Sequence, residues 1–186
     1  MVKLIPLMRK ADERGWFAEA YNQRRFAEFG IDVEFRQDNH VFSSVPGVLR
    51  GLHFQVPPRA QAKLVRCLRG RVWDVAVDVR AGSPTYGRWA AAELTAANGL
   101  SMYVPVGFAH GYLTLEADTE VEYKVSDFHA PDQERGLAWD DPALAIAWPL
   151  PESGPVLSEK DRRLPRLSDL MSPFPYEGPP LAMLET

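Results

Sequence analysis

The sequence predicts one all-β domain, an antiparallel β-sandwich or barrel of the jelly-roll type with a few short helices. Short runs rich in Val, Phe, Leu, Tyr and Trp recur at even spacing, separated by Gly, Pro, Asn and Asp. Helix signals are few, and no internal repeat or low-complexity linker divides residues 1–186. The space between the sheets of such a fold is the natural place for a ligand.

The expected elements follow in chain order. The strands are Val33–Phe35, Lys63–Cys67, Val72–Val79, Trp89–Leu94, Leu100–Val104, Gly111–Leu115 and Glu120–Val125. Alternation along Val72–Val79 places Asp74 and Asp78 on one face. Two helices are expected, Asn22–Phe29 and a short one at Ser158–Arg162 with Ser158 as its N-cap. From about residue 149 the chain is rich in proline, which predicts an extended tail wrapping the domain.

Composition and charge exclude several classes of protein. Apolar residues make up 46% and charged residues 25%, as in a soluble globule, and no run approaches the ~20 apolar residues of a membrane span. A net charge of -4 argues against a general nucleic-acid binder. Cys67 is the only cysteine, and residues 1–15 lack the pattern of a secretion signal, so a cytoplasmic protein is expected.

Residues 48–55, VLRGLHFQ, are the first candidates for chemistry. In a regular strand Arg50 and His53 point to opposite faces, but a bulge or bend at Gly51 would bring both into one cavity. Alternatively, His53 is a hydrogen-bonded core histidine and Arg50 a surface charge. Lys63, among apolar neighbours in QAKLVR, either extends to water or lies in a cavity, where it would stabilise an enolate oxygen or a phosphate.

Residues 105–110, PVGFAH, carry a more specific signal. The pattern Pro-x-Gly-x-x-His resembles the second motif of the cupin superfamily, in which the histidine is often a metal ligand. The first cupin motif supplies a His-x-His pair, whereas this chain has His-Phe-Gln at residues 53–55. Because a divalent metal needs three or four suitable ligands, we interpret His110 as a cavity histidine and expect no metal.

Ten segments, including these, stand in one order between about Asp12 and Pro165. They are DERG (12–15), EAYNQ (19–23), FRQDNH (35–40), GVLRGLHFQ (47–55), QAKLVR (61–66), DVAVDVR (74–80), SPTYG (83–87), PVGFAHG (105–111), YK (123–124) and LSEKD (157–161). Together they resemble the dTDP-4-dehydrorhamnose 3,5-epimerase family. The members of this family are cupin-like enzymes that act on sugar nucleotides.

The resemblance implies a role for each matched residue. His53 would be the general base, Asp161 its orienting partner and Tyr123 the general acid across the sugar ring, although a strand tyrosine by itself more often packs in a core. The sugar-nucleotide site would be lined by Arg14, Glu19, Gln37, Asp38, Asn39, Arg50, Lys63, His110, Glu134 and Lys160. The family also implies a homodimer in which the N-terminal region crosses to the partner, with no metal or organic cofactor.

The implied reaction inverts C3, C5 or both in a nucleotide-linked 4-keto-6-deoxyhexose, such as dTDP-4-dehydro-6-deoxyglucose. Protons next to the C4 ketone are acidified because the carbanion delocalises into an enolate. An imidazole, whose ordinary pKa is ~6.5, can remove such a proton, and a carboxylate on its other nitrogen fixes the tautomer. A phenol returns a proton from the opposite face, and the guanidinium groups of Arg14 and Arg50 suit a diphosphate.

One position departs from the family pattern. Six residues after the acid tyrosine, the family has an aromatic residue that stacks on the thymine ring, whereas this chain has His129, preceded by Phe128. Either side chain would serve, or the chain takes another nucleotide such as a GDP- or CDP-sugar. Further alternatives are an epimerase of one centre only, a metal-dependent cupin that uses His110, and a jelly roll that binds a sugar nucleotide without turnover.

Overall fold

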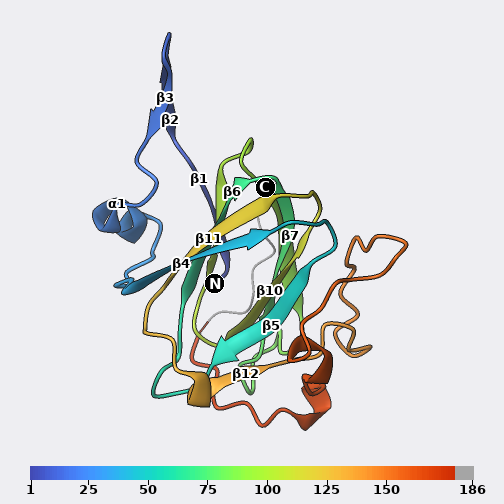
Figure 1. The fold of residues 1–186 in the computed structure, drawn as a ribbon. Helices are drawn as coiled ribbons and strands as arrows, with labels where there is room; N and C mark the ends of the chain where they lie inside the picture. Colours follow the sequence, from blue (N-terminus) through green and yellow to red (C-terminus); the bar gives the residue numbers. More distant parts are fainter. Residues whose placement is uncertain (179–186) are drawn as a thin grey trace.

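A computed structural model describes residues 1–178 and contains two facing, five-stranded antiparallel sheets (Figure 1). The first sheet has the strand order β1 (Lys3–Pro6), β9 (Leu100–Val104), β6 (Lys63–Arg69), β11 (Thr119–Val125) and β4 (Gln37–Ser43). The second has the order β12 (Glu134–Gly136), β5 (Leu49–Gln55), β10 (Phe108–Thr114), β7 (Arg71–Asp78) and β8 (Trp89–Thr95). The predicted all-β jelly roll is confirmed.

The core lies between the two sheets because alternate residues of each strand point inward. Val65 and Met102 from the first sheet pack there with Val72, Leu94 and Phe108 from the second. The inner faces of β5, β10 and β11 carry polar side chains as well, so one part of the sandwich interior is polar. That polar part is the candidate site.

The outer faces of the sheets are covered by different segments. Helix α1 (Gln23–Glu28) lies over the first sheet, where Phe26 packs with Leu64 and Tyr103. The tail wraps the second sheet, where Phe174 packs with Phe54 and Val77. Short 3-10 helices, η1 (Pro131–Gln133), η2 (Asp161–Arg163) and η3 (Leu167–Asp169), shape the chain after β11.

Three of the expected elements change in type or become shorter, and the ends of most other expected strands shift by one to three residues. Val33–Phe35 forms no strand, because its apolar side chains pack beside α1 rather than pairing with a neighbouring strand. The expected helix at Asn22–Phe29 is the shorter α1, with the Asn22 side chain accepting hydrogen bonds from two backbone N–H groups. The helix expected at Ser158–Arg162 is only the 3-10 turn η2, whose first N–H, that of Asp161, donates to Ser158 Oγ at 3.1 Å.

A hairpin that the sequence did not predict projects from the sandwich (Figure 1). It consists of β2 (Arg9–Asp12) and β3 (Gly15–Ala18) and carries Arg14 at its tip, paired with Asp12. Trp16 and Phe17 on this hairpin are 57% and 71% exposed. Among residues 1–178, no helix is long and apolar enough to cross a membrane.

The bend considered in the sequence is present in β5. Opposite β10, Arg50 pairs with Tyr112 and His53 with His110, so three residue steps on one strand face two on the other. Gly51 has φ of 118°, and a Cβ added there would lie 2.6 Å from the Cα of Gly111. This bulge turns both Arg50 and His53 toward the cavity between the sheets.

Replacing Gly51 by alanine is expected to destabilise the fold through both the backbone angle and the close contact. Gly82 provides the matched control, because its φ is also positive, 81°, but no atom lies within 4 Å of an added Cβ. Gly82→Ala should lower the free energy of unfolding by about 1–2 kcal/mol, and Gly51→Ala by roughly 2 kcal/mol more, since backbone has to move. Urea denaturation measures both, and equal losses would contradict the close packing at Gly51.

Candidate active site

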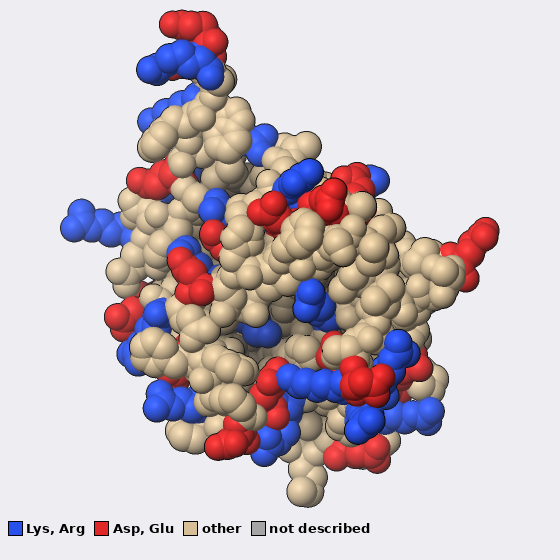
Figure 2. Space-filling model, viewed as in Figure 1, with Lys and Arg blue, Asp and Glu red and all other residues tan. Residues whose placement is uncertain are grey.

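The polar interior contains one cavity with two compartments. The first, of about 280 Å³, we call the His129 compartment; its lining includes Gln37, Asn39, Gln55, Gln61, His129 and Glu134. The second, of about 250 Å³, we call the Tyr112 compartment; its lining includes Val41, Arg50, His110, Tyr112, Ser158, Lys160 and Asp161. His53, Lys63 and Tyr123 line both. Figure 2 shows the molecule hollowed near the centre of this face, with Lys and Arg side chains in the hollow.

A histidine–aspartate pair joins the second sheet to the tail. His53 Nε2 lies 2.6 Å from Asp161 Oδ1, and Ser158 Oγ donates to the other carboxylate oxygen at 2.8 Å. Burial alone would raise the pKa of the Asp161 carboxyl, but the hydrogen bonds from His53 and Ser158 outweigh burial and hold that pKa below its ordinary value. An ionised carboxylate only accepts, so Nε2 donates, and on a neutral ring the free lone pair is on Nδ1.

The free nitrogen of His53 faces a second carboxylate. Glu134 Oε1 is 4.0 Å from Nδ1, and Glu134 Oε2 is 2.6 Å from the ammonium of Lys160. Burial opposes ionisation of Glu134, but the hydrogen bond from Lys160 prevails and lowers the pKa of the carboxyl. His53 therefore has an acceptor on one ring nitrogen and an ion pair near the other.

Lys63 is a cation held inside the sandwich. The side chain is buried, and its ammonium donates to the backbone carbonyl of His53 at 3.3 Å. Burial lowers the pKa of Lys63 to about 8, while the charges of Glu134 and Asp74 oppose that effect. Within residues 1–178 this buried ammonium has a single backbone acceptor, so it is well placed to stabilise an anionic oxygen in the cavity.

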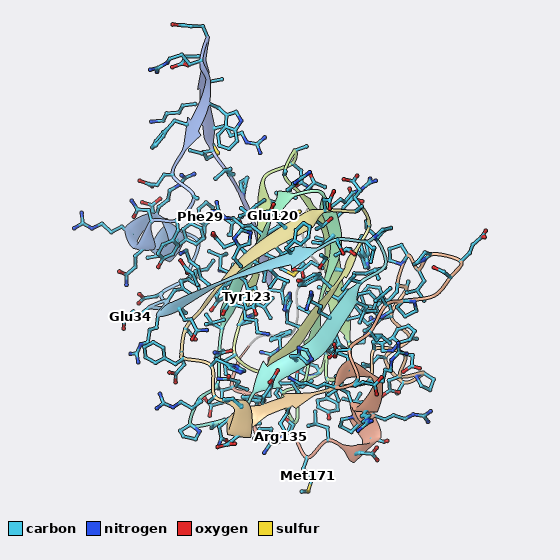
Figure 3. All side chains as sticks on the ribbon, viewed as in Figure 1. Phe29, Glu34, Glu120, Tyr123, Arg135 and Met171 are labelled. Atoms are coloured by element: carbon cyan, nitrogen blue, oxygen red, sulfur yellow. The ribbon has the colours of Figure 1, made fainter. Side chains whose placement is uncertain are left out.

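Tyr123 comes from the opposite sheet. It lies on β11, and Figure 3 shows it between the sheets. Burial raises the pKa of the Tyr123 phenol, and the charge of Arg50 acts against this rise. Because His53 is on β5 and Tyr123 on β11, a ligand in the shared part of the cavity has an imidazole from one sheet and a phenol from the other.

His110 forms a second histidine–carboxylate pair. His110 Nε2 is 2.7 Å from Asp74 Oδ1, and both residues are buried. Burial lowers the pKa of His110, although Asp74 opposes the shift. Within residues 1–178, no three His, Cys, Asp or Glu side chains are grouped so that they could hold a metal ion.

Other predicted site residues divide into two groups. Gln37 and Asn39 line the His129 compartment and are hydrogen-bonded to each other at 2.8 Å. Asp38 between them points outward to Lys124, because neighbouring strand residues face opposite sides. Phe128 is 54% exposed and does not line the cavity, whereas His129 does.

Arg14 and Glu19 also lie outside the cavity of their own chain. Arg14 is at the tip of the projecting hairpin, where its only recorded partner within residues 1–178 is Asp12. Glu19 directly follows the same hairpin. The single chain therefore does not bring these two residues to the site in which the sequence placed them.

Sequence analysis did not single out several residues that line the cavity. Gln55 and Gln61 both donate to backbone carbonyls in the loop that carries His129, those of Phe128 and Asp127. Both glutamines lie within matched motifs, so the motifs contained the signal. The cavity position of Tyr112 had no such signal, because a tyrosine in a strand is normally a packing residue.

The fold and the cavity together define the class of protein: a cupin-like carbohydrate epimerase, with a histidine and a tyrosine on facing sheets. Comparison with known sequences makes the assignment specific. The sequence model of the family described as dTDP-4-dehydrorhamnose 3,5-epimerase matches residues 2–169. The chain belongs to this family, as predicted.

Individual relatives agree with that assignment. A dTDP-4-dehydrorhamnose 3,5-epimerase of Sinorhizobium fredii is 51% identical over 94% of this chain and 89% of its own. The Pseudomonas aeruginosa protein of the same name is 54% identical over 82% of this chain and 83% of its own. A Legionella pneumophila dTDP-6-deoxy-D-glucose-3,5-epimerase, solved in complex with dTDP-4-keto-L-rhamnose, superimposes with a TM-score of 0.90. It is 41% identical and covers 95% of this chain and 94% of its own.

Proposed function

We propose that this protein inverts C3 and C5 of dTDP-4-dehydro-6-deoxyglucose and so produces dTDP-4-dehydrorhamnose. The single observation that carries the chemistry is the placement of His53 and Tyr123 on facing sheets around one cavity. The names of the relatives supply the substrate class. Inversion at a carbon next to a ketone requires only a base on one face, an acid on the other and stabilisation of the enolate between them.

Proton removal is assigned to His53. Its Nδ1 takes the proton from the carbon next to the C4 ketone, and the C–H electron pair moves into the enolate. Asp161, 2.6 Å from Nε2, stabilises the imidazolium that forms and keeps the ring in the required tautomer. The same base serves both centres after the ring turns over in the cavity.

The enolate oxygen is assigned to Lys63. Among the described residues its ammonium has one backbone acceptor, so the developing negative charge on the C4 oxygen becomes its strongest partner. Tyr123 then delivers its phenolic proton to carbon from the face opposite His53, which inverts the centre. The pKa of Tyr123, raised by burial, keeps that proton in place at neutral pH.

The remaining polar residues of the cavity are assigned to binding the substrate. Arg50, His110, Glu134 and Lys160 surround the shared part of the cavity, and Gln37 and Asn39 lie toward the loop of His129. We assign the nucleobase to that loop, with His129 as the stacking side chain. An imidazole offers a smaller flat surface than a phenol, so the nucleobase contact is weaker there than on a tyrosine.

The assembly proposed is a homodimer in which each hairpin completes the partner's cavity. The hairpin exposes Trp16 and Phe17 and holds Arg14 outside its own cavity, and an arm of that kind suits a second copy. Arg14 and Glu19 then reach the diphosphate end of the partner's substrate. A cytoplasmic setting without nucleic-acid partners fits the net charge of -4 and the single, buried Cys67.

Hydrogen exchange tests the base directly. In deuterated water the wild-type protein should place deuterium at both C3 and C5 of the keto sugar. His53→Asn should reduce that exchange by about 10²- to 10⁴-fold, since it removes the general base. Mass spectrometry and proton NMR of the sugar measure the label.

His40→Asn is the matched control, because His40 is an exposed histidine outside the cavity, and its exchange rate should equal the wild type. Undiminished exchange in His53→Asn would remove His53 as the base. Deuterium at one carbon only would indicate a single-centre epimerase. Loss of activity on adding a chelator would indicate a metal-dependent enzyme. Tight binding of the nucleotide sugar without any exchange would indicate a binding protein.

Lys63 should produce an alkaline limb in the pH profile. The pKa of Lys63 is about 8, so the ammonium is charged below that pH and neutral above it. The kcat/KM, which reports the free enzyme, should therefore fall as pH rises through about 8. Lys63→Arg keeps the positive charge but changes its shape. The plateau of kcat/KM should therefore be lower in this variant, and the alkaline fall of kcat/KM should move to higher pH. An unmoved limb would assign the titration to another group.

Mixed dimers test the crossing of the hairpin. Arg14→Ala and His53→Asn chains are expected to be nearly inactive separately. In a mixed dimer, the cavity with intact His53 receives Arg14 from the other chain, so one of the two cavities is complete. Because about half of the dimers are mixed when the chains pair at random, coexpression should restore about a quarter of the wild-type activity. No recovery, with both variants dimeric by size-exclusion chromatography, would show that Arg14 does not act across the dimer.

A further inference from the structure

The loop that carries His129 is hydrogen-bonded along its whole length. This His129 loop covers residues 126–130, between β11 on the first sheet and η1, and has no regular secondary structure. The N–H of Ser126 donates to the carbonyl of Ala62 at 3.0 Å. Each of the next four residues has a backbone N–H or C=O bonded to the side chain of a glutamine. Surface loops are in general more mobile than the elements they connect, so this loop has an unusual degree of restraint.

Two of the glutamines hold the loop from the first sheet. Gln37 is the first residue of β4, and its side-chain oxygen accepts from the N–H of His129 at 3.0 Å. Gln61 comes two residues before β6, and its amide donates to the carbonyl of Asp127 at 2.7 Å. The backbone of His129 is therefore tied directly to the sheet that also carries Tyr123.

Gln55 holds the loop from the second sheet. It is the last residue of β5 and is only 3% exposed. Its amide nitrogen donates to the carbonyls of Phe128 at 3.2 Å and Arg59 at 2.6 Å, and its amide oxygen accepts from the N–H of Ala130 at 2.8 Å. A glutamine amide has two N–H donors, and both are used here. The Gln55 side chain therefore serves the loop, although it also lies in the wall of the His129 compartment.

These bonds fix the backbone at His129 and on both sides of it. Gln55 bonds the residue before His129 and the residue after it, and Gln37 bonds His129 itself. The imidazole nevertheless remains exposed and lines the compartment, so a ligand can reach it. A group that is already held in its binding position loses less conformational entropy when the ligand arrives.

We propose that Gln55 and Gln61 are positioning residues for nucleotide recognition, which hold His129 in place to receive the nucleobase. The inference rests on the proposed function, which assigns the nucleobase to His129. An imidazole offers a small surface for stacking, so its contribution to affinity depends on being in place beforehand. The groups assigned to the diphosphate and the keto sugar, such as Arg50 and Lys63, are on strands outside the loop. Loosening the loop thus weakens the nucleobase contact alone.

The variant Gln55→Met removes the amide and keeps a side chain of similar length. Isothermal titration calorimetry should show the Kd of dTDP raised about tenfold, because the loop then has to be ordered on binding. The Kd of inorganic pyrophosphate, which has no base, should be unchanged. With the keto-sugar nucleotide, KM should rise about tenfold while kcat stays within about twofold. An equal loss of affinity for dTDP and pyrophosphate would overturn the inference.

Gln61→Met is the second variant, chosen because Gln61 is less buried and its loss is less disruptive to folding. It removes one bond to the loop, so the Kd of dTDP should rise about threefold. Gln133→Met is the matched control. Gln133 lies on η1 directly after the loop, but among the described residues its side chain neither lines the cavity nor bonds the loop, and dTDP affinity should equal the wild type. An unchanged Kd of dTDP in both Gln55→Met and Gln61→Met would overturn the inference.

A double-mutant cycle with His129→Ala tests whether Gln55 acts through that side chain. His129→Ala alone should raise the Kd of dTDP about tenfold, since a stacking side chain is lost. Adding Gln55→Met should then change the Kd by less than about twofold. A full tenfold effect of Gln55→Met without His129 would overturn the inference. An unchanged Kd in His129→Ala would remove the nucleobase assignment and the inference with it, whereas dTDP binding without hydrogen exchange in the wild type would overturn the epimerase function alone.

Discussion

The hydrogen bond between His53 and Asp161 is the interaction on which the arrangement of the site depends. It joins residues 108 positions apart, one on a central strand of the sandwich and one on a 3-10 turn of the tail. The carboxylate fixes which imidazole nitrogen carries the proton, and Ser158 fixes the carboxylate in turn. The orientation of the His53 imidazole toward the cavity is therefore set by a segment outside the two sheets.

The second constraint is that the charged and polar groups of the site are inside a β-sandwich. Burial disfavours the charged forms of Lys63 and His110 and the ionised form of Tyr123, and their pKa values shift accordingly. The groups are held by the sheets and by the tail, so they need little rearrangement when charge develops on a substrate. Electrostatic preorganisation of this kind is a large contribution to catalysis in many enzymes.

Much of the fold follows from local patterns in the sequence, and much of the site does not. Alternation and turn residues identified most strands of the sandwich, but Val33–Phe35 has the same apolar character and packs beside a helix instead. The bend at Gly51 was foreseeable because Arg50 and His53 need it to share a cavity. The partners of Asp161 and Asp74 depend on the tertiary fold. Only the family resemblance, which runs over most of the chain, indicated that Asp161 would pair with His53. Tyr112 resembled any core tyrosine, and Asp38 was placed at the site by the family resemblance, although strand alternation turns its side chain outward to Lys124.

The wrapped tail has a consequence for how the cavity is completed. Backbone hydrogen bonds tie residues 174 and 176 to Ala81, and Phe174 packs on the second sheet beside Phe54. The two sheets are complete once the residues of β12 have been added, whereas the carboxylate that orients the histidine follows later in the chain. The tail thus supplies Ser158, Lys160 and Asp161 to the lining of the Tyr112 compartment, so the cavity is complete only when the tail has docked.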